Sequence, residues 1–205
     1  MHNYTWFSED GTWDNKLQAT GLTERTWAII LTKALETGRL ISAHSTIMNM
    51  YDPEKRVHMI VDEWGTWFKT EPGTNPGFLY QQNTICDALV AALHFHIFHK
   101  HADRVKMANL AQTVNVLQAV LLTEGNKMIK TPTYHVFEMF VPHQDAQALP
   151  LTITSETWTR DKYTLPSVDA SASKDKNGTL HVSLVNLHPS DEQKLLIDIR
   201  GLAVK

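Results

Sequence analysis

Two adjacent carboxylates, Asp62 and Glu63, follow a mostly apolar run at 57–61 and precede the tryptophans at positions 64 and 67. A continuous apolar run is typical of a strand buried on both faces, as in a parallel sheet. In α/β barrels the catalytic residues lie at the carboxyl ends of such strands. A carboxylate flanked by aromatic side chains suits a reaction in which positive charge develops on a sugar ring. The alternative is a strand end with a helix-capping acid and two core tryptophans.

The composition indicates a chain that can bury a core. Its 205 residues are 42% hydrophobic, its formal net charge is -3 and its basic residues are scattered, which argues against a nucleic-acid partner. The N-terminus lacks the features of a secretory signal, and no apolar window is long enough to span a bilayer. The single cysteine, Cys86, is interpreted as a small buried hydrophobe. We therefore expect a soluble, cytoplasmic protein with no membrane partner.

The first three quarters of the chain alternate between strand-like and helix-like patterns. Thr84 and Asp87 have the spacing of a capping box, which predicts that a helix begins there. The alternation predicts βα units around a parallel sheet. The expected elements are helices over 23–49, 84–101, 114–122 and 131–141, and strands over 57–61 and 105–108.

The pattern changes near Pro150. From there on, short apolar segments alternate with Gly, Asp and Asn turns, and the segment 180–186 has the period of two that is typical of a half-buried strand. The expected strands are 151–157, 168–173, 180–186 and 195–199. This part of the chain is predicted to be an antiparallel β module.

Four histidines crowd the second expected helix, at positions 94, 96, 99 and 101. A metal site is one interpretation, but zinc sites need three or four converging ligands, and His94 and His96 point in roughly opposite directions on a helix. The favoured interpretation is a partly buried helix end whose histidines interact with the C-terminal helix dipole. We predict no metal site and no cofactor.

Two further groups of residues leave their roles open. The aromatic side chains of Trp6, Phe7 and Trp13, in a loop over 5–20, could line a pocket or pack the loop down. Gln112 and Asn115 could hydrogen-bond sugar hydroxyls, but on pattern alone they are expected to satisfy loop backbone groups.

Four segments together resemble the family 51 glycoside hydrolases, the intracellular α-L-arabinofuranosidases. They read VDEWGTWF at 61–68, PGTNPGFLYQQNT at 72–84, HADRVKMANLAQTVNVLQA at 101–119 and TPTYHVFEMFVPHQDA at 131–146. The resemblance covers nearly the whole chain. It implies an (α/β)8 barrel followed by a jelly-roll-like β domain. It also implies removal of terminal arabinofuranose units, with retention, through a covalent glycosyl-enzyme intermediate.

The resemblance assigns roles to five residues. Glu63 matches the catalytic nucleophile, and Trp67 matches an aromatic residue that packs near the sugar. His2 and Tyr4 match residues that end barrel strand six. Gln112 matches the amide at the end of strand eight that contacts the sugar, which replaces the loop role expected from pattern alone.

The resemblance also implies a second carboxylate, the general acid/base, in a GNE-type motif on strand four, and this chain contains no such motif. We therefore expect a fragment: barrel strands six to eight with their helices over 1–148, then part of a β-sandwich domain over 149–205. The implied substrates are arabinan- or arabinoxylan-type oligosaccharides, and a homo-oligomer is implied for the full-length form. The alternative is a catalytically incomplete carbohydrate-binding or interaction fragment.

Overall fold

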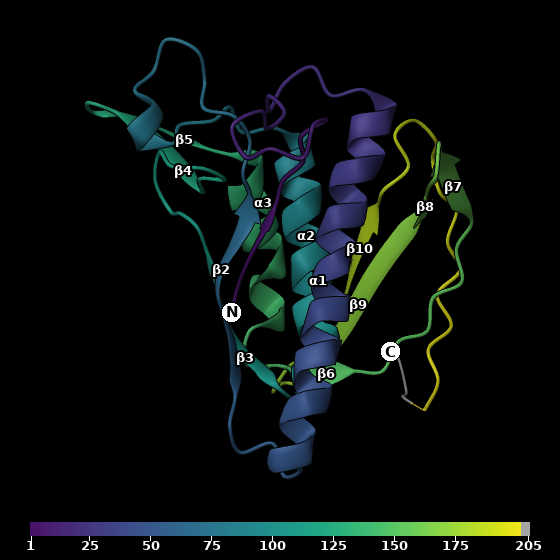
Figure 1. Cartoon of the computed structure of the whole chain (residues 1–205). Coiled ribbons are helices and arrows are strands. Elements are labelled where there is room, and N and C mark those ends of the chain that lie inside the picture. Colours follow the sequence, from purple (N-terminus) through teal and green to yellow (C-terminus); the bar gives the residue numbers. More distant parts are fainter. Residues whose placement is uncertain (202–205) are drawn as a thin grey trace.

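The computed structural model describes residues 1–201 and combines a parallel sheet, a layer of helices and antiparallel strands (Figure 1). Its elements in chain order are β1 (His2–Thr5), α1 (Glu24–Tyr51), β2 (Met59–Thr66), η1 (Pro76–Phe78), α2 (Ile85–Lys100), β3 (Val105–Leu110), β4 (Leu121–Glu124), β5 (Lys127–Lys130), α3 (Pro132–Phe140), η2 (Val141–His143), β6 (Gln147–Leu149), β7 (Thr157–Arg160), β8 (Tyr163–Pro166), β9 (Val168–Lys174) and β10 (Leu180–Asn186).

The parallel sheet has the strand order β1-β2-β3, with α1 and α2 as the crossovers between successive strands. Parallel neighbours require such crossovers, because the chain must return to the same end of the sheet. Both helices pack on one face of the sheet, and the carboxyl ends of β1 and β2 lie at the upper end of the molecule in Figure 1. The predicted βα alternation is therefore confirmed.

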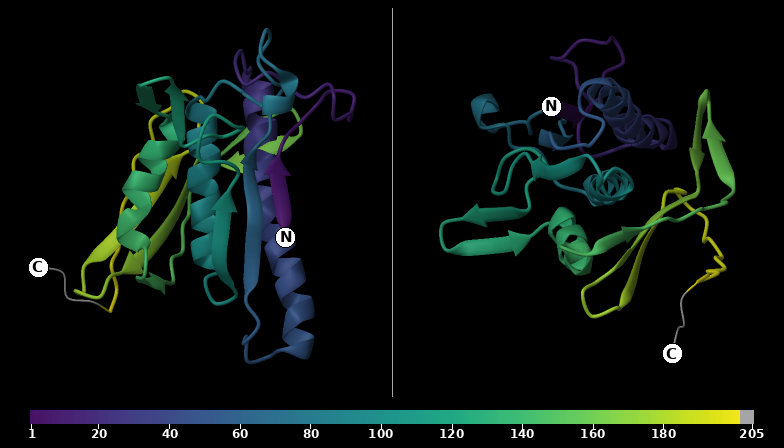
Figure 2. Two further views of the ribbon diagram at one scale, coloured as in Figure 1. Left: turned by 90° about the vertical axis from the view of Figure 1, so that its left-hand side faces the viewer. Right: turned by 90° about the horizontal axis from the view of Figure 1, so that it is seen from below.

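Helix α2 lies between two sheets. It contacts β2 on one side and β9 and β10 on the other, and it also packs on α1 and α3 (Figure 2). The predicted capping box is confirmed, since the Thr84 side chain accepts from the Cys86 amide and the Asp87 carboxylate accepts from the Thr84 amide. A helix packed between two sheets and two other helices is apolar over most of its surface, and Cys86 lies on its buried part.

The antiparallel strands β10-β9-β6 form a second sheet, and β7 and β8 form a separate hairpin. The strands expected at 168–173 and 180–186 are confirmed as β9 and β10. The strand expected at 151–157 is wrong, because the chain there is irregular until β7 begins at Thr157. The segment 195–199 is also irregular rather than a strand. It pairs with no strand in residues 1–201, and Leu196 is 96% exposed, so this short apolar segment does not form a strand.

The helix expected over 114–122 is also wrong. The segment is irregular up to β4, and Asn115 and Leu117 have φ values of 59° and 52° that a right-handed helix excludes. Its apolar residues Leu117 and Ala119 are buried as a loop instead. The Leu117 amide donates to the Leu79 carbonyl, so contacts with the loop after β2 satisfy the backbone without a helix.

Candidate active site

A bulge in β2 turns both carboxylates towards the face of the sheet that the helices do not cover. Val61 pairs with Ala108 and Trp64 with Leu110, so β2 uses three steps where β3 uses two. A bulge of this kind bends a strand and re-aims its side chains. Val61 and Trp64 are both fully buried on the helix side, whereas the side chains of Asp62 and Glu63 are 61% and 43% exposed.

The strand β2 therefore extends through the carboxylates, beyond the predicted strand at 57–61. The α-helices of the described chain begin after Thr23, Thr84 and Thr131, and η1 and η2 begin after Asn75 and Phe140. Neither carboxylate is therefore a helix cap. Trp64, by contrast, lies fully in the core, as the alternative interpretation of this segment expected.

Strand β1 supplies two partners to Glu63. His2 is in register with Glu63, and Tyr4 follows on the same face of the strand, because side chains alternate across a sheet. The Tyr4 hydroxyl donates a hydrogen bond of 2.6 Å to Glu63 Oε2, and His2 Nδ1 lies 3.3 Å from the same oxygen. Burial and then the neighbouring Glu63 carboxylate raise the pKa of Tyr4, which keeps its hydroxyl a neutral donor. The nucleophile candidate is thus held in place while solvent still reaches it.

The second carboxylate is bound to the same histidine from the other side. His2 Nε2 lies 3.3 Å from Asp62 Oδ2, and the Asn109 amide donates to Asp62 Oδ1 at 3.3 Å. His2 therefore bridges two acids, and Asn109 connects them to β3. No role was predicted for Asn109 from the sequence.

A row of aromatic rings extends from Tyr4. The rings of Tyr4 and Trp67 lie 4.8 Å apart, those of Trp67 and Trp13 lie 4.7 Å apart, and those of Trp13 and Trp6 lie 5.0 Å apart, all edge to face. Lys16 Nζ lies 3.8 Å from the centre of the Trp13 ring. The aromatic loop whose role the sequence left open therefore packs onto Trp67, beside the carboxylate site.

A buried polar network supports the end of β2. The Thr66 amide donates to Gln118 Oε1 at 2.7 Å, and Gln118 Nε2 donates to the Asp87 carbonyl at 2.7 Å. The Thr66 hydroxyl donates to Asp87 Oδ1 and accepts from Gln81 Nε2 at 2.9 Å. Burial raises the pKa of the Asp87 carboxyl, and these donors oppose that effect. Sequence reasoning found Asp87 only as a cap and missed both glutamines.

Glycine at position 65 fits this network closely. Gly65 has a φ of 134°, and a Cβ there would lie 3.2 Å from Leu110 Cδ1 and 3.3 Å from Gln118 Oε1. A residue with a Cβ would be strained at this φ, and its Cβ would press against these two neighbours. The glycine therefore lets β2 approach the segment after β3 immediately beyond Glu63.

The fifth predicted residue, Gln112, lies outside the hydrogen-bond cluster around Glu63. It is exposed and follows Leu110, which pairs with Trp64, so the register places it at the same edge of the sheet. The structure thus brings His2, Tyr4 and Glu63 into contact. The Trp67 ring packs on Tyr4 rather than on Glu63 directly. Gln112 lies at the edge of the sheet, outside these contacts.

The histidines at 94, 96 and 99 pack α2 against its neighbours, each with a hydrogen-bond partner on another element. His94 is fully buried, with Nδ1 2.8 Å from the Val90 carbonyl and Nε2 3.1 Å from the Thr37 hydroxyl, and its ring stacks 5.0 Å from that of Trp64. Burial lowers the pKa of His94 to about 4. His94 therefore stabilises Trp64 behind the carboxylate site as a neutral ring.

The next two histidines point to β9. His96 Nδ1 lies 3.1 Å from Asp169 Oδ2, and His99 Nδ1 lies 2.8 Å from the Ser171 hydroxyl. His143 continues this row, bound to the hydroxyls of Ser173 and Ser183. In residues 1–201, no group of three or more His, Cys, Asp or Glu has an arrangement that could hold a metal ion.

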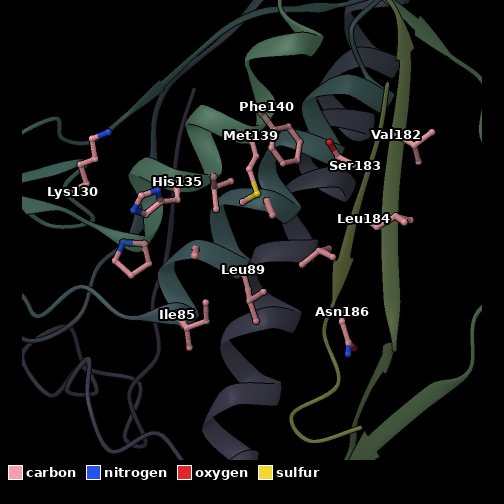
Figure 3. A pocket seen from close by; sticks show the side chains of 15 residues that line it. Ile85, Leu89, Lys130, His135, Met139, Phe140, Val182, Ser183, Leu184 and Asn186 are labelled. Carbon is pink, nitrogen blue, oxygen red and sulfur yellow. The ribbon is translucent and has the colours of Figure 1, made fainter. Parts of the chain in front are cut away.

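A separate groove of about 830 Å³ lies between α2, α3 and β10 (Figure 3). Its walls include Ile85, Leu89, Met139 and Leu184, and Glu63 is not among them. This mostly apolar groove is therefore distinct from the carboxylate site. Among the helices that the structure describes, none combines the length and apolar character that crossing a bilayer requires.

Comparison with known proteins identifies the family. Residues 62–205 match the model of the alpha-L-arabinofuranosidase C-terminal domain. An intracellular exo-alpha-L-arabinofuranosidase of Bacteroides ovatus is 45% identical over the whole chain, and an intracellular exo-alpha-(1->5)-L-arabinofuranosidase of Halalkalibacterium halodurans is 27% identical over 72% of it. The chain spans 40% and 32% of the lengths of these relatives.

The fold leads to the same family. The crystal structure of the GH51 arabinofuranosidase from Xanthomonas axonopodis pv. citri matches 93% of this chain and 38% of its own, with a TM-score of 0.89 and 49% identity. The arabinose complex of the alpha-L-arabinofuranosidase from Thermotoga maritima has the same fold over 90% of this chain, with a TM-score of 0.61 and 24% identity. The matched family model, the Bacteroides relative and this fold together show that the chain belongs to the α-L-arabinofuranosidases of glycoside hydrolase family 51.

Proposed function

We propose that this chain forms part of a retaining α-L-arabinofuranosidase in which Glu63 is the nucleophile. The observation that carries the proposal is the Glu63 carboxylate, fixed by Tyr4 and His2 on the open face of a parallel sheet, in a member of this family. In this proposal residues 1–148 are strands six to eight of a (β/α)8 barrel with their helices. Residues 149–205 belong to a jelly-roll-like β domain.

The reaction proceeds in two displacements. Glu63 attacks the anomeric carbon of the terminal arabinofuranose, the bond to the leaving oxygen breaks, and water later releases the sugar from Glu63 with retained configuration. A retaining enzyme places its acid/base carboxyl about 5 Å from the nucleophile, where it protonates the leaving oxygen. The proposal assigns that role to a carboxylate outside this chain, because the GNE-type motif has no match here.

The other four residues serve binding and orientation. Tyr4 donates to Glu63 and His2 bridges Glu63 and Asp62, so both orient the nucleophile before attack. Trp67, with its edge-to-face neighbours, supplies an apolar wall for one face of the sugar ring. Gln112, at the rim of the sheet, hydrogen-bonds a sugar hydroxyl.

The substrates proposed are arabinofuranosyl oligosaccharides of the arabinan or arabinoxylan type. The names of the relatives from Bacteroides ovatus and Halalkalibacterium halodurans describe intracellular exo-acting enzymes. By analogy we place this protein in the cytoplasm, acting on chain ends, and we propose a homo-oligomer for the full-length form.

Covalent trapping tests this function. The protein expressed from its full reading frame is incubated with an arabinofuranosyl mechanism-based inhibitor, and the labelled peptide is located by mass spectrometry. We expect one label, on Glu63, and none in the Glu63→Gln variant. Label on another residue, or no label on folded protein that hydrolyses arabinofuranosides, would contradict the assignment of Glu63.

A second candidate function is carbohydrate binding or interaction without catalysis. It is favoured by the open face of the sheet, where Ile60 is 42% and Met107 is 53% exposed, together with the row of tryptophans beside it. This reading predicts that arabino-oligosaccharides bind in a calorimeter while neither turnover nor label is detected.

A further inference from the structure

A chain of hydrogen bonds connects the helix layer to β1. Asn3 Nδ2 donates to the Thr37 hydroxyl at 2.6 Å, and that hydroxyl lies 3.1 Å from Nε2 of His94. Asn3 belongs to β1, Thr37 to α1 and His94 to α2. Thr37 and His94 are fully buried, and a buried polar group that loses its partner keeps the full cost of its desolvation. The chain therefore joins three elements through contacts that water cannot replace.

The direction of each hydrogen bond follows from the groups that form it. The Val90 carbonyl can only accept, so His94 Nδ1, 2.8 Å away, carries the ring proton. Burial lowers the pKa of His94 to about 4, and the neutral ring therefore has a lone pair on Nε2. The Thr37 hydroxyl donates its one proton to that nitrogen and accepts from Asn3. This hydroxyl is thus donor and acceptor at once, and a methyl group in its place would break both bonds.

The same chain returns to the sheet beside Glu63. The ring of His94 stacks on that of Trp64, with the two centroids 5.0 Å apart and the two planes at 19° to each other. Trp64 is in turn the register partner of Asn3 in the pairing of β1 with β2. The contacts from Asn3 through Thr37 and His94 to Trp64 therefore form a closed ring of interactions that includes both strands.

The pair formed by Asn3 and Trp64 lies next to the residues that contact Glu63. His2 and Tyr4 flank Asn3 in β1, and Glu63 precedes Trp64 in β2. Because side chains alternate across a sheet, the two flanking side chains face the open side whereas Asn3 faces the helices. A shift of β1 along β2 would therefore move both partners of Glu63 away from its carboxylate.

No other side-chain hydrogen bond in residues 1–201 connects β1 to a helix. The side chains of His2 and Tyr4 bond the acids on β2, and the Thr5 hydroxyl is buried without a partner. Within the same residues, β2 is the one strand that pairs with β1. Backbone hydrogen bonds repeat along a strand, so side-chain contacts set the register. The bond from Asn3 to Thr37 is therefore the polar contact that fixes β1 against the helix layer.

We infer that Thr37 is a positioning residue for the proposed nucleophile. Its hydroxyl holds β1 in the register at which Tyr4 and His2 reach the Glu63 carboxylate. The inference rests on the proposed function, because it takes Glu63 as the group that attacks the sugar. Thr37 is fully buried, so its effect passes through β1 to the orientation of Glu63.

Replacing the hydroxyl by a methyl group tests this role. The protein from the full reading frame is assayed on 4-nitrophenyl α-L-arabinofuranoside. Thr37→Val keeps the shape of the side chain but breaks both hydrogen bonds. We expect kcat to fall about tenfold, because a small displacement of a reacting group slows the reaction, while KM stays within about twofold. Thr37→Ser keeps the hydroxyl and should restore kcat to within about twofold of the wild-type value.

The matched control is Thr32→Val on the same helix. The Thr32 hydroxyl is also shielded from water but has no hydrogen-bond partner in residues 1–201, so the same substitution there removes no bond. It should leave both kcat and KM unchanged. Thermal melts followed by circular dichroism define a temperature at which the variants are folded. Where Thr37→Val does not fold, Asn3→Leu removes the donor at the other end of the chain and should give the same loss of kcat.

An unchanged kcat in folded Thr37→Val, or a higher KM at constant kcat, would overturn the inference. A Thr37→Ser protein as slow as Thr37→Val would do the same, since the hydroxyl would then not matter. If the wild type hydrolyses no arabinofuranoside, the proposed function fails, and hydrogen–deuterium exchange tests the register role by itself. Faster exchange of the β1 amides in Thr37→Val than in Thr32→Val would support that role, and equal exchange would overturn it.

Discussion

Two clusters of histidines and acids lie on opposite sides of the parallel sheet. On the open side, the side chains of His2, Asp62 and Glu63 are 53%, 61% and 43% exposed. On the helix side, those of His96 and Asp169 are 0% and 8% exposed. The buried pairs connect α2 to the antiparallel sheet, whereas the open cluster connects neighbouring strands and leaves its acids accessible to a ligand.

The comparison teaches that residue type does not distinguish a cluster accessible to a ligand from a structural one. A metal site was one interpretation of the closely spaced histidines at 94, 96, 99 and 101, yet each of His94, His96 and His99 is used in packing. Burial lowers the pKa of both His94 and His99 to about 4, so they are neutral at physiological pH. The two clusters differ in solvent exposure and in their hydrogen-bond partners, and the fold determines both.

The largest expected effect concerns the open cluster. Glu63→Gln should lower kcat on 4-nitrophenyl α-L-arabinofuranoside by at least about a thousandfold, because removing one member of a catalytic unit disables the unit. Its Tm should stay close to that of the wild type, since the side chain is half-exposed. Glu36→Gln, an exposed acid on α1, is the control and should retain full activity. An active Glu63→Gln protein would remove the functional difference between the clusters.

The buried cluster should affect stability instead, through pH. The unfolded chain protonates His94 near pH 6.5, and the folded chain does so near pH 4. The unfolded state therefore binds more protons in this interval, and stability is lost as the pH falls from 6.5 to 4. For His94 the linked loss is about 3 kcal/mol, and His99, which is less buried, adds less.

Urea unfolding between pH 7 and pH 4 measures this loss. His94→Gln should be less stable at pH 7 but should lose less stability on acidification than the wild type. Equal slopes for wild type and His94→Gln would show that the buried ring does not set the acid sensitivity.

A smaller effect is expected where the open cluster is held in place. Tyr4→Phe removes the hydroxyl that donates to Glu63 and little else. A hydrogen bond to a charged group is worth about 1.5–3 kcal/mol, so kcat should fall about tenfold to a hundredfold. Steady-state kinetics on the nitrophenyl substrate give this value. A loss below twofold would mean that Tyr4 does not orient the nucleophile.

The smallest effect is expected at the more exposed acid. Asp62 contacts His2 and Asn109 at 3.3 Å in a solvated setting, and exposed pairs of this kind contribute about 0–1 kcal/mol. Asp62→Asn should therefore lower kcat at most about fivefold. A loss approaching that of Glu63→Gln would place Asp62 in the reaction itself and require a different division of roles between the two acids.

The sequence by itself determined the features that depend on local chemistry. The capping box at Thr84, the alternation of strands and helices around β2, and the strands β9 and β10 follow from nearest neighbours and periodicity. The resemblance of four segments also led to the family. Local signals failed at 114–122, where an apolar segment is buried as a loop by contacts with residues near position 80.

Only the tertiary structure decided how the site is assembled. Tyr4 and Glu63 are 59 residues apart in sequence, and Thr66 and Gln118 are 52 apart, so no local pattern reports their hydrogen bonds. The bulge that turns Asp62 and Glu63 to the open face depends on how β2 pairs with β3. Which histidines are buried depends on the packing of α2 between two sheets. The sequence led to Glu63 as the proposed nucleophile, whereas long-range pairing and burial decided which groups hold its side chain.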